Sequence, residues 1–315
     1  MVNNQVKFSI IAIAIIIPLS SYSVWASDSN LPITKSENSQ KLQIISSFYP
    51  LYDFAQNVGK DKVEVFLLIP EGVEPHDWEP TIQDVQLMQK SDLIIINGIG
   101  FERWVEKLEI MNYQGIILDT SKGITNDSSF LESNNESVKN SIQENDHELG
   151  DPHIWLNPAF AQLQVQSIAN EFSELDPENK KFYEKNAQDY ISKLDKLDKK
   201  IRNELSNCNH DFIAFHDAFS YFANEYHLNQ HTIISSNDPH IDPTGKTLEN
   251  VIKTARELNI KIIFTEDTVN PKISNVIANE IGGKTLVLSP IEISGNGNYI
   301  SKMNDNLENL KEALC

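Results

Sequence analysis

The sequence is short of basic residues: 26 lysine and arginine side chains face 45 aspartate and glutamate side chains, and the formal net charge at pH 7 is -19. An acidic surface repels phosphate groups and offers no basic stripe, so no nucleic acid is expected as a partner. Cations are at least not repelled. The length of 315 residues and the 40% share of hydrophobic residues are ordinary for a globular chain with two domains of normal size.

Cysteine is scarcer still, since Cys208 and Cys315 are the only two in the sequence. They form no Cys-based zinc motif. In an exported chain an even pair is compatible with one disulfide that closes a long loop, and two unpaired buried thiols are the alternative. Such a disulfide would stabilise the fold by about 4 to 5 kcal/mol according to the chain-entropy model.

Residues 1–26 have the composition of a secretory signal peptide. Lys7 carries their one charge, an apolar run extends over residues 8–19, and residues 24–26 form a V-x-A cleavage site. We therefore expect cleavage after Ala26 and an exported protein that is periplasmic or lies on the extracellular surface. No cysteine stands near the end of this segment, so the usual bacterial lipid anchor is not expected. An uncleaved membrane anchor is the alternative, although three serines weaken it.

Beyond a polar stretch at residues 27–41, which is expected to be a flexible leader, strand-like and helix-like patterns alternate. Strands that alternate with helices form parallel sheets covered on both faces, so the fold class is predicted to be α/β. The predicted strands span residues 42–47, 63–69, 93–97, 115–118, 211–215, 231–235, 261–265 and 285–288. The predicted helices include residues 50–58, 81–89, 101–110, 158–175, 217–226, 244–258, 272–281 and 299–314.

One long helix is predicted to join two lobes. Its apolar residues recur every three or four positions: Ala187, Tyr190, Leu194, Leu197, Ile201 and Leu205. This pattern gives an N-terminal α/β lobe at 42–175, a linking helix at 176–207 and a C-terminal α/β lobe at 208–315. A polar tract at 121–150 interrupts the first lobe and is expected to be a mobile loop, with its single His147 solvated. Ligands of parallel sheets bind outside the carboxyl ends of the strands, so a ligand is expected in the cleft between the lobes.

Three histidines occupy rigid positions near the ends of predicted elements. His76 lies in VEPHDWEP, His153 in DPHIWLNP and His216 in FHDAFSYF, and each has prolines or aromatic residues around it. Neutral imidazoles that converge from separate segments suit a cation such as zinc. Carboxylates next to the histidines are candidates to orient their rings through hydrogen bonds. These carboxylates belong to Asp77, Asp151 and Asp217.

Four peptides follow one another along the chain, with a polar tract before the third: VEPHDWEP, NGIGFERWVEKL, DPHIWLNP and FHDAFSYFANEY. In this order they resemble the motifs of the zinc and manganese solute-binding proteins of metal ABC transporters. The resemblance extends from about Leu42 to the C-terminus. It implies two α/β lobes, one long linking helix and a metal in the interlobe cleft, in agreement with the pattern described above.

The same resemblance implies that His76, His153 and His216 are the three imidazole ligands. Many family members carry an acid in a Leu-Asp-Pro sequence near the C-terminus, where this chain has Ser289 between a leucine and a proline. The fourth ligand is then expected to be a water molecule, Glu292 or Glu74, in that order of preference.

Other polar residues receive weaker roles. Glu266, in FTED at the end of a predicted strand, is a candidate to support a ligand or to join the lobes, and an ordinary surface carboxylate is the equal alternative. The remaining histidines match no motif and are expected to be structural or to lie on the surface: His210, His227, His231 and His240.

The resemblance implies a monomeric binding protein, not an enzyme, that captures a divalent metal outside the membrane and passes it to an ABC transporter permease with its ATPase. Three histidines without a firm carboxylate favour Zn²⁺ over Mn²⁺, because manganese prefers more oxygen ligands. Two alternatives stay open. Three histidines with an open fourth position can activate water, as in an exported zinc-dependent hydrolase. A solute-binding scaffold is also compatible with a metal-binding surface adhesin.

Overall fold

A computed structural model describes residues 41–110, 113, 115–124, 150–236 and 239–315. The predicted signal peptide, the leader up to residue 40 and residues 125–149 of the polar tract, with His147, lie outside the described residues. Lys41–Cys315 forms one compact unit. Among the helices of the described ranges, none has the length and apolar character needed to cross a membrane.

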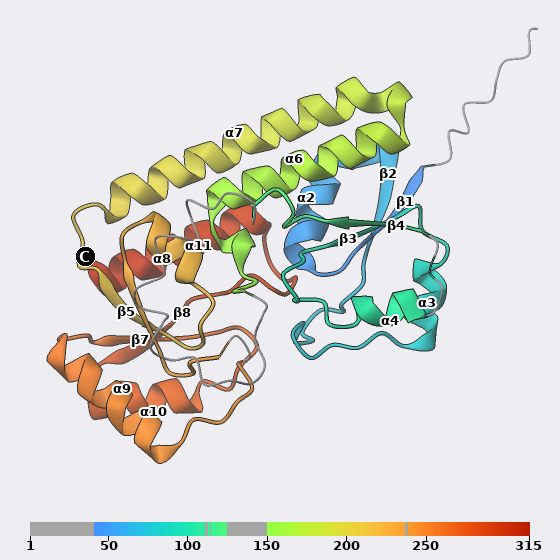
Figure 1. Ribbon diagram of the computed structural model, residues 1–315. Helices are drawn as coiled ribbons and strands as arrows, with labels where there is room; N and C mark the ends of the chain where they lie inside the picture. Colours follow the sequence, from blue (N-terminus) through green and yellow to red (C-terminus); the bar gives the residue numbers. More distant parts are fainter. Residues whose placement is uncertain (1–40, 111–112, 114, 125–149, 237–238) are drawn as a thin grey trace, which may run out of the picture. The chain divides into compact units, whose positions relative to one another are not determined.

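Two four-stranded sheets, all of whose strands are parallel, form the two lobes (Figure 1). The strand order is β2-β1-β3-β4 in the first sheet and β6-β5-β7-β8 in the second. The α/β class with two parallel-sheet lobes is confirmed. The strands are β1 (Leu42–Ser46), β2 (Val63–Leu67), β3 (Leu93–Ile96), β4 (Ile116–Asp119), β5 (Asp211–Ala214), β6 (Asn229–Thr232), β7 (Ile262–Thr265) and β8 (Lys284–Val287).

Two of the central strands, β3 and β7, are short runs rich in β-branched residues. β3 reads LIII and β7 reads IIFT, and every residue of both is buried. Such side chains fit strands that are covered on both faces. In the second sheet, alternate residues therefore face opposite ways: Phe212 and Phe264 join the large core that includes α11, whereas Ile213 and Ile263 join a smaller core with residues of α9 and α10.

Several helices begin at a residue whose side chain caps them. Asn157 Oδ1 accepts a hydrogen bond from Ala159 N at 2.8 Å, and Pro158 follows it as the first helical residue. Thr81 and Asn298 form capping boxes. The α-helices are α2 (Tyr49–Gly59), α3 (Ile82–Met88), α4 (Val105–Ile110), α6 (Pro158–Leu175), α7 (Lys180–Leu205), α8 (Ser220–Glu225), α9 (Gly245–Glu257), α10 (Lys272–Glu280) and α11 (Tyr299–Leu314). Short 3₁₀ turns are η2 (Lys60–Lys62), η4 (Ile154–Leu156) and η5 (Pro177–Asn179).

The predicted linking helix is α7, which runs beside α6 (Figure 1). It contacts α2 of the first lobe and α11 of the second. The six apolar residues of its predicted stripe are all buried, and Tyr183 and Asn186 extend the buried face. The buried residues of α7 belong to one hydrophobic core that also contains Phe54 of the first lobe and Phe264 of the second. The two lobes therefore share a continuous core along this helix.

Several predicted elements differ from the observed ones at their ends. The helix expected at 217–226 is α8, which begins only at Ser220, and the linking helix expected at 176–207 is α-helical over Lys180–Leu205. The helix expected at 101–110 begins only at Val105: Gly98, Ile99 and Gly100 have positive φ, and residues 101–104 continue this loop as turns. The strand expected at 231–235 is β6, Asn229–Thr232. Its apolar neighbours Ile233 and Ile234 lie past the strand, although their N–H groups still donate to β5 and the residue after it.

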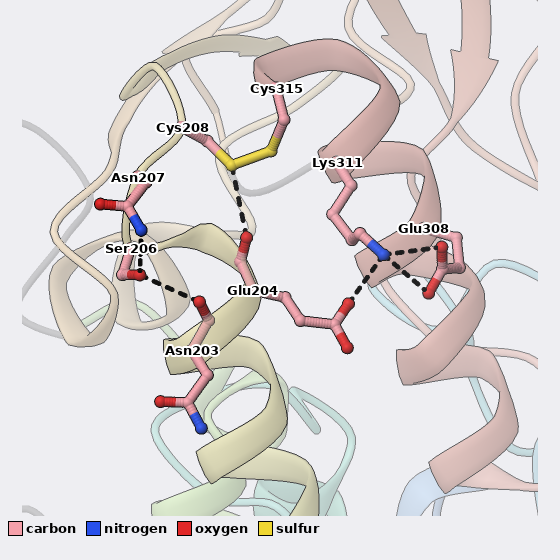
Figure 2. Close-up of a disulfide and its surroundings, with 8 residues drawn as sticks. All are labelled: Asn203, Glu204, Ser206, Asn207, Cys208, Glu308, Lys311 and Cys315. Carbon is pink, nitrogen blue, oxygen red and sulfur yellow. Dashed lines mark hydrogen bonds and ion pairs between the residues drawn. A yellow bond between two sulfur atoms is a disulfide. The ribbon is translucent and has the colours of Figure 1, made fainter.

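A disulfide between Cys208 and Cys315 ties the segment after α7 to the end of α11 (Figure 2). The two Cα atoms are 4.6 Å apart. Close by, Lys311 of α11 forms an ion pair with Glu204 of α7 at 2.8 Å. These contacts fix the C-terminal helix to the linking helix at one end.

Candidate metal centre

The three sequence-predicted histidines meet between the two sheets. His76 lies in the loop after β2, His153 immediately precedes η4, and His216 comes two residues after the end of β5. His153 and His216 are 0% exposed, and His76 is 8% exposed. The Nε2 atom of His153 is 3.3 Å from Nε2 of His76 and 3.3 Å from Nε2 of His216.

Glu292, from the segment between β8 and α11, joins this cluster. Its Oε1 atom lies 3.3 Å from Nε2 of His76 and 3.4 Å from Nε2 of His153. Ligand atoms of the three histidines and of Glu292 all lie within 4.8 Å of one another, and all four residues are buried. One atom from each of four separate segments thus points to a common centre.

The spacing of these atoms fits a tetrahedral cation. A zinc ion about 2.0 to 2.1 Å from each of four ligand atoms would place those atoms about 3.3 to 3.4 Å apart. Four distances between pairs of ligand atoms are 3.3, 3.3, 3.3 and 3.4 Å. These are four of the six distances in a set of four atoms, and the remaining two are bounded at 4.8 Å. Most edges of the cluster therefore already have the length found in a zinc coordination shell.

The other ring nitrogen of two histidines is held by a carboxylate. Asp151 Oδ1 lies 2.7 Å from Nδ1 of His153, and Glu266 Oε1 lies 2.7 Å from Nδ1 of His216. A proton on each Nδ1 leaves the Nε2 lone pair free to face the centre.

The adjacent acids expected to orient the rings are only partly those observed. Asp151 contacts its histidine, but Asp217 accepts hydrogen bonds from Ser220 and Gln230, and Glu266 takes its place beside His216. The reason is geometric: Glu266 directly follows β7, the neighbour of β5, so both strands deliver their next residues to the same edge of the sheet. Sequence adjacency could not reveal this pairing.

Ser289 turns away from the histidines. Its hydroxyl contacts a carboxylate oxygen of Asp267 and accepts a hydrogen bond from Ile291 N at 3.1 Å. Ile291 then has φ of 61°, which is rare for a β-branched residue. This turn carries the chain from Ser289 to the side chain of Glu292.

Glu74, the third candidate for the fourth position, lies at the margin of the cluster. Its Oε1 atom accepts from His76 N at 3.3 Å, and its Oε2 atom accepts from Thr268 of the other lobe at 3.3 Å. His240 approaches the same carboxylate at 3.9 Å. Elsewhere His231 contacts Asp211 at 2.9 Å, and His210 and His227 are exposed.

Burial and charge act in opposite directions on the titration of these groups. Burial lowers the pKa of His76, and the Glu292 carboxylate only partly offsets this effect. Burial would also lower the pKa of His153, but Asp151 and Glu292 outweigh it and raise the pKa to about 10. The histidine charges hold the pKa of Glu292 well below its usual value despite burial. Burial and the Glu292 carboxylate raise the pKa of Glu74 to about 8. The pKa values of His76, His153 and Glu74 thus all depend on the Glu292 carboxylate.

The family to which the chain belongs follows from its sequence. A family model described as "ZnuA: Zinc-uptake complex component A periplasmic" matches residues 44–313. The chain belongs to this family. The resemblance to metal solute-binding proteins is therefore confirmed, and the protein is an exported binding component and not an enzyme.

Individual relatives agree with this assignment. The chain is 39% identical over 284 residues to the "High-affinity zinc uptake system protein ZnuA" of Bacillus subtilis (strain 168), covering 87% of this chain and 88% of the relative. It is 34% identical to the "Zinc-binding lipoprotein AdcA" of Streptococcus pneumoniae (strain ATCC BAA-255 / R6), covering 86% of this chain but only 56% of the relative. It thus spans just over half the length of that longer protein.

A solved structure shares the fold. The Zn(II)-bound AdcA of Streptococcus pneumoniae superposes with a TM-score of 0.72 at 32% identity, and the match covers 87% of this chain and 57% of that one. Two lobes with a long helix between them are therefore an architecture that this chain has in common with a zinc-bound protein.

Proposed function

We propose that this protein captures Zn²⁺ outside the cytoplasmic membrane through His76, His153, His216 and Glu292 and delivers it to an ABC transporter. The ion is the cargo, and no bond of a substrate is made or broken. The observation that carries the proposal is the set of four distances near 3.3 Å among buried atoms of four different segments. Their size is that expected of the edges of a zinc tetrahedron.

Buried carboxylate oxygens add support. Among the described residues, Glu292 Oε2, Glu266 Oε2 and Asp151 Oδ2 are buried and have no hydrogen-bond partner. Buried carboxylates without full compensation are unfavourable, and a divalent cation at the centre would stabilise all three electrostatically. The donor set of three imidazoles and one carboxylate is typical of zinc and poor in the oxygen ligands that manganese prefers.

The structure of the lobes bears on how the metal would be released. His76 and Glu292 belong to different lobes, so a small shift of one lobe would separate two ligands of the site. The continuous core along α7 opposes large movements of the lobes. Release of the metal is then expected when the permease locally displaces the loops that carry the ligands.

The mature protein is expected to act as a monomer, with its signal peptide removed after Ala26.

Metal titration of the mature protein tests this function. Chelator-stripped protein is expected to bind one zinc ion tightly in competition with a chromophoric chelator, and His76→Ala, His153→Ala and His216→Ala should each reduce the affinity by orders of magnitude. His210→Ala, at an exposed histidine, is the matched control and should leave it unchanged. Unchanged affinity in all three ligand variants would refute the site. Intact mass and sedimentation of the exported protein check the cleavage position and the monomeric state.

A further inference from the structure

The segment that carries Glu292 contains no helix or strand to fix it. It lies between the end of β8 at Val287 and the start of α11 at Tyr299. Ile291 next to the ligand has positive φ, and so do Gly295 and Gly297 further along. A loop of this kind adopts one conformation only when other groups hold it. The position of the Glu292 carboxylate therefore depends on contacts made by its neighbours.

Several of these contacts come from the same lobe. Asn306 of α11 brackets Ser289, accepting from its N–H at 2.8 Å and donating to its carbonyl oxygen at 2.7 Å. Asp267, after β7, holds the Ser289 hydroxyl. These bonds place residue 289 relative to the second sheet. They do not place it relative to His76 and His153, which belong to the first lobe.

Trp155 supplies the link to the histidines. Its indole Nε1–H donates to the carbonyl oxygen of Pro290 at 2.7 Å, and both residues are buried. The carbonyl oxygen of Trp155 in turn accepts a hydrogen bond from the Tyr299 hydroxyl at the start of α11. Two hydrogen bonds thus join the segment of His153, two residues before Trp155, to both ends of the loop that carries Glu292.

The indole ring of Trp155 is held in place by aromatic neighbours. Its ring packs edge-on against Phe48 at 4.6 Å and against Phe101 at 5.1 Å between ring centroids. Phe101 also packs against the ring of His76 at 4.9 Å. An aromatic cluster that touches His76 and His153 therefore aims the indole N–H at the loop of Glu292.

We propose that Trp155 is a positioning residue of the metal site, whose indole N–H holds Glu292 against the histidines through the Pro290 carbonyl group. The proposal deepens the proposed zinc-binding function and rests on it. Without this hydrogen bond the buried Pro290 carbonyl loses its partner, and the loop is free to withdraw the carboxylate. Supporting groups of this kind typically change metal affinity by about 10- to 100-fold.

The test compares Trp155→Phe with a matched variant, Trp104→Phe. Trp104 is also buried in the first lobe, but its Nε1 has no hydrogen-bond partner among the described residues. Zinc affinity is measured for both variants in the wild-type background and in a Glu292→Gln background. We expect Trp155→Phe to lower the affinity about 10- to 100-fold in the wild-type background and by no more than about twofold with Glu292→Gln, whereas Trp104→Phe leaves it unchanged.

A spectroscopic measurement separates positioning from general loss of stability. Cobalt(II) bound in a four-coordinate site absorbs strongly in the visible range, and we expect this absorption to weaken both in Trp155→Phe and in Glu292→Gln. Tyr299→Phe removes the second hydrogen bond and should lower the affinity in the same direction, which keeps the test decisive if Trp155→Phe does not fold. Wild-type zinc affinity and an unchanged cobalt spectrum in the variant that folds would overturn the proposal while leaving the zinc function intact. Failure of the wild-type protein to bind zinc would overturn both.

Discussion

Glu266 uses one oxygen to accept two hydrogen bonds from His216, from Nδ1 at 2.7 Å and from the backbone N–H at 3.1 Å. Asp151 binds His153 in the same way, at 2.7 and 3.0 Å. In each pair the carboxylate sets both the rotation of the ring and the nitrogen that carries the proton. Two histidines of the candidate site, from different segments, are therefore held by carboxylates in the same way.

This support predicts a graded effect of substitution. Glu266→Ala should lower zinc affinity by about 10- to 100-fold, because the His216 ring loses its orientation and its Nε2 becomes less basic. Glu266→Gln keeps an acceptor for Nδ1–H and should lose less. Chelator competition measures both, with Glu249→Ala on the exposed face of α9 as a control. Equal affinity in Glu266→Ala and the wild type would contradict the assigned role.

The fourth ligand can be identified by comparing two carboxylates. Glu292→Ala removes an atom 3.3 Å from Nε2 of His76, whereas Glu74 contacts only the backbone N–H of that residue at 3.3 Å. We expect Glu292→Ala to weaken zinc binding by at least tenfold more than Glu74→Ala does. Isothermal titration of the two variants decides between them. A larger loss in Glu74→Ala would reverse the assignment.

The buried carboxyl group of Glu102 is expected to make the unfolding free energy of the protein depend on pH, independently of the candidate metal ligands. It accepts hydrogen bonds from Ser47 Oγ and from the N–H groups of Asn97 and Gly98, but burial outweighs these and raises its pKa from 4.5 to about 7. Because the folded chain keeps this proton between those two pH values, the stability from Glu102 is fully present below about pH 4.5. It is lost as the pH rises to 7. The loss amounts to about 3 kcal/mol.

Urea unfolding of metal-free protein at a series of pH values measures this effect. The difference in unfolding free energy between the wild type and Glu102→Gln should fall by about 3 kcal/mol from pH 4.5 to 7.5, with a constant offset because the glutamine amide faces an N–H donor. The histidines titrate in both proteins and cancel in the difference. Parallel pH curves would show that the pKa of Glu102 is the same in the folded and unfolded chains and would contradict this prediction.

The disulfide predicts a change in stability without a change in function. Cys208 and Cys315 are 107 positions apart in sequence, so removing the cross-link should lower the unfolding free energy by about 4 to 5 kcal/mol. Cys315 lies at the far end of the 16-residue α11 from Tyr299, about 24 Å along the helix axis. Zinc affinity of the Cys208→Ser, Cys315→Ser variant should therefore stay at the wild-type value. Equal unfolding free energies with and without the disulfide would contradict this prediction.

The fold could be predicted largely from local patterns. Runs such as LIII in β3 and the apolar stripe of α7 encode their structures within a few residues, and these elements were found where the pattern predicts them. The start of α4 could not be predicted in this way, because three successive positive φ values precede it and the Glu102 carboxylate in the loop accepts a hydrogen bond from Ser47, 55 positions away. Local propensity contains no information on such a long-range hydrogen bond.

The candidate site was likewise predicted in part, where local motifs show its residues, and missed where long-range contacts define it. His76, His153 and His216 stand in recognisable motifs, and the structure brings all three together. From the sequence, a water molecule is preferred to Glu292 as the fourth ligand. No local pattern shows that a turn at Ser289 and a positive φ at Ile291 direct the Glu292 side chain toward the histidines. The contacts of Glu266 and Trp155 join residues 50 and 135 positions apart. Only the packing of the two sheets reveals them.

Zinc binding by purified mature protein tests the central claim most directly. We predict one zinc ion per chain after exposure to an equimolar mixture of zinc and manganese, and loss of that ion in His153→Ala, whose ring nitrogen lies within 3.4 Å of three other ligand atoms. Elemental analysis after desalting measures both. A chain that retains manganese in preference to zinc, or a His153→Ala variant that still holds one zinc ion per chain, would contradict the account.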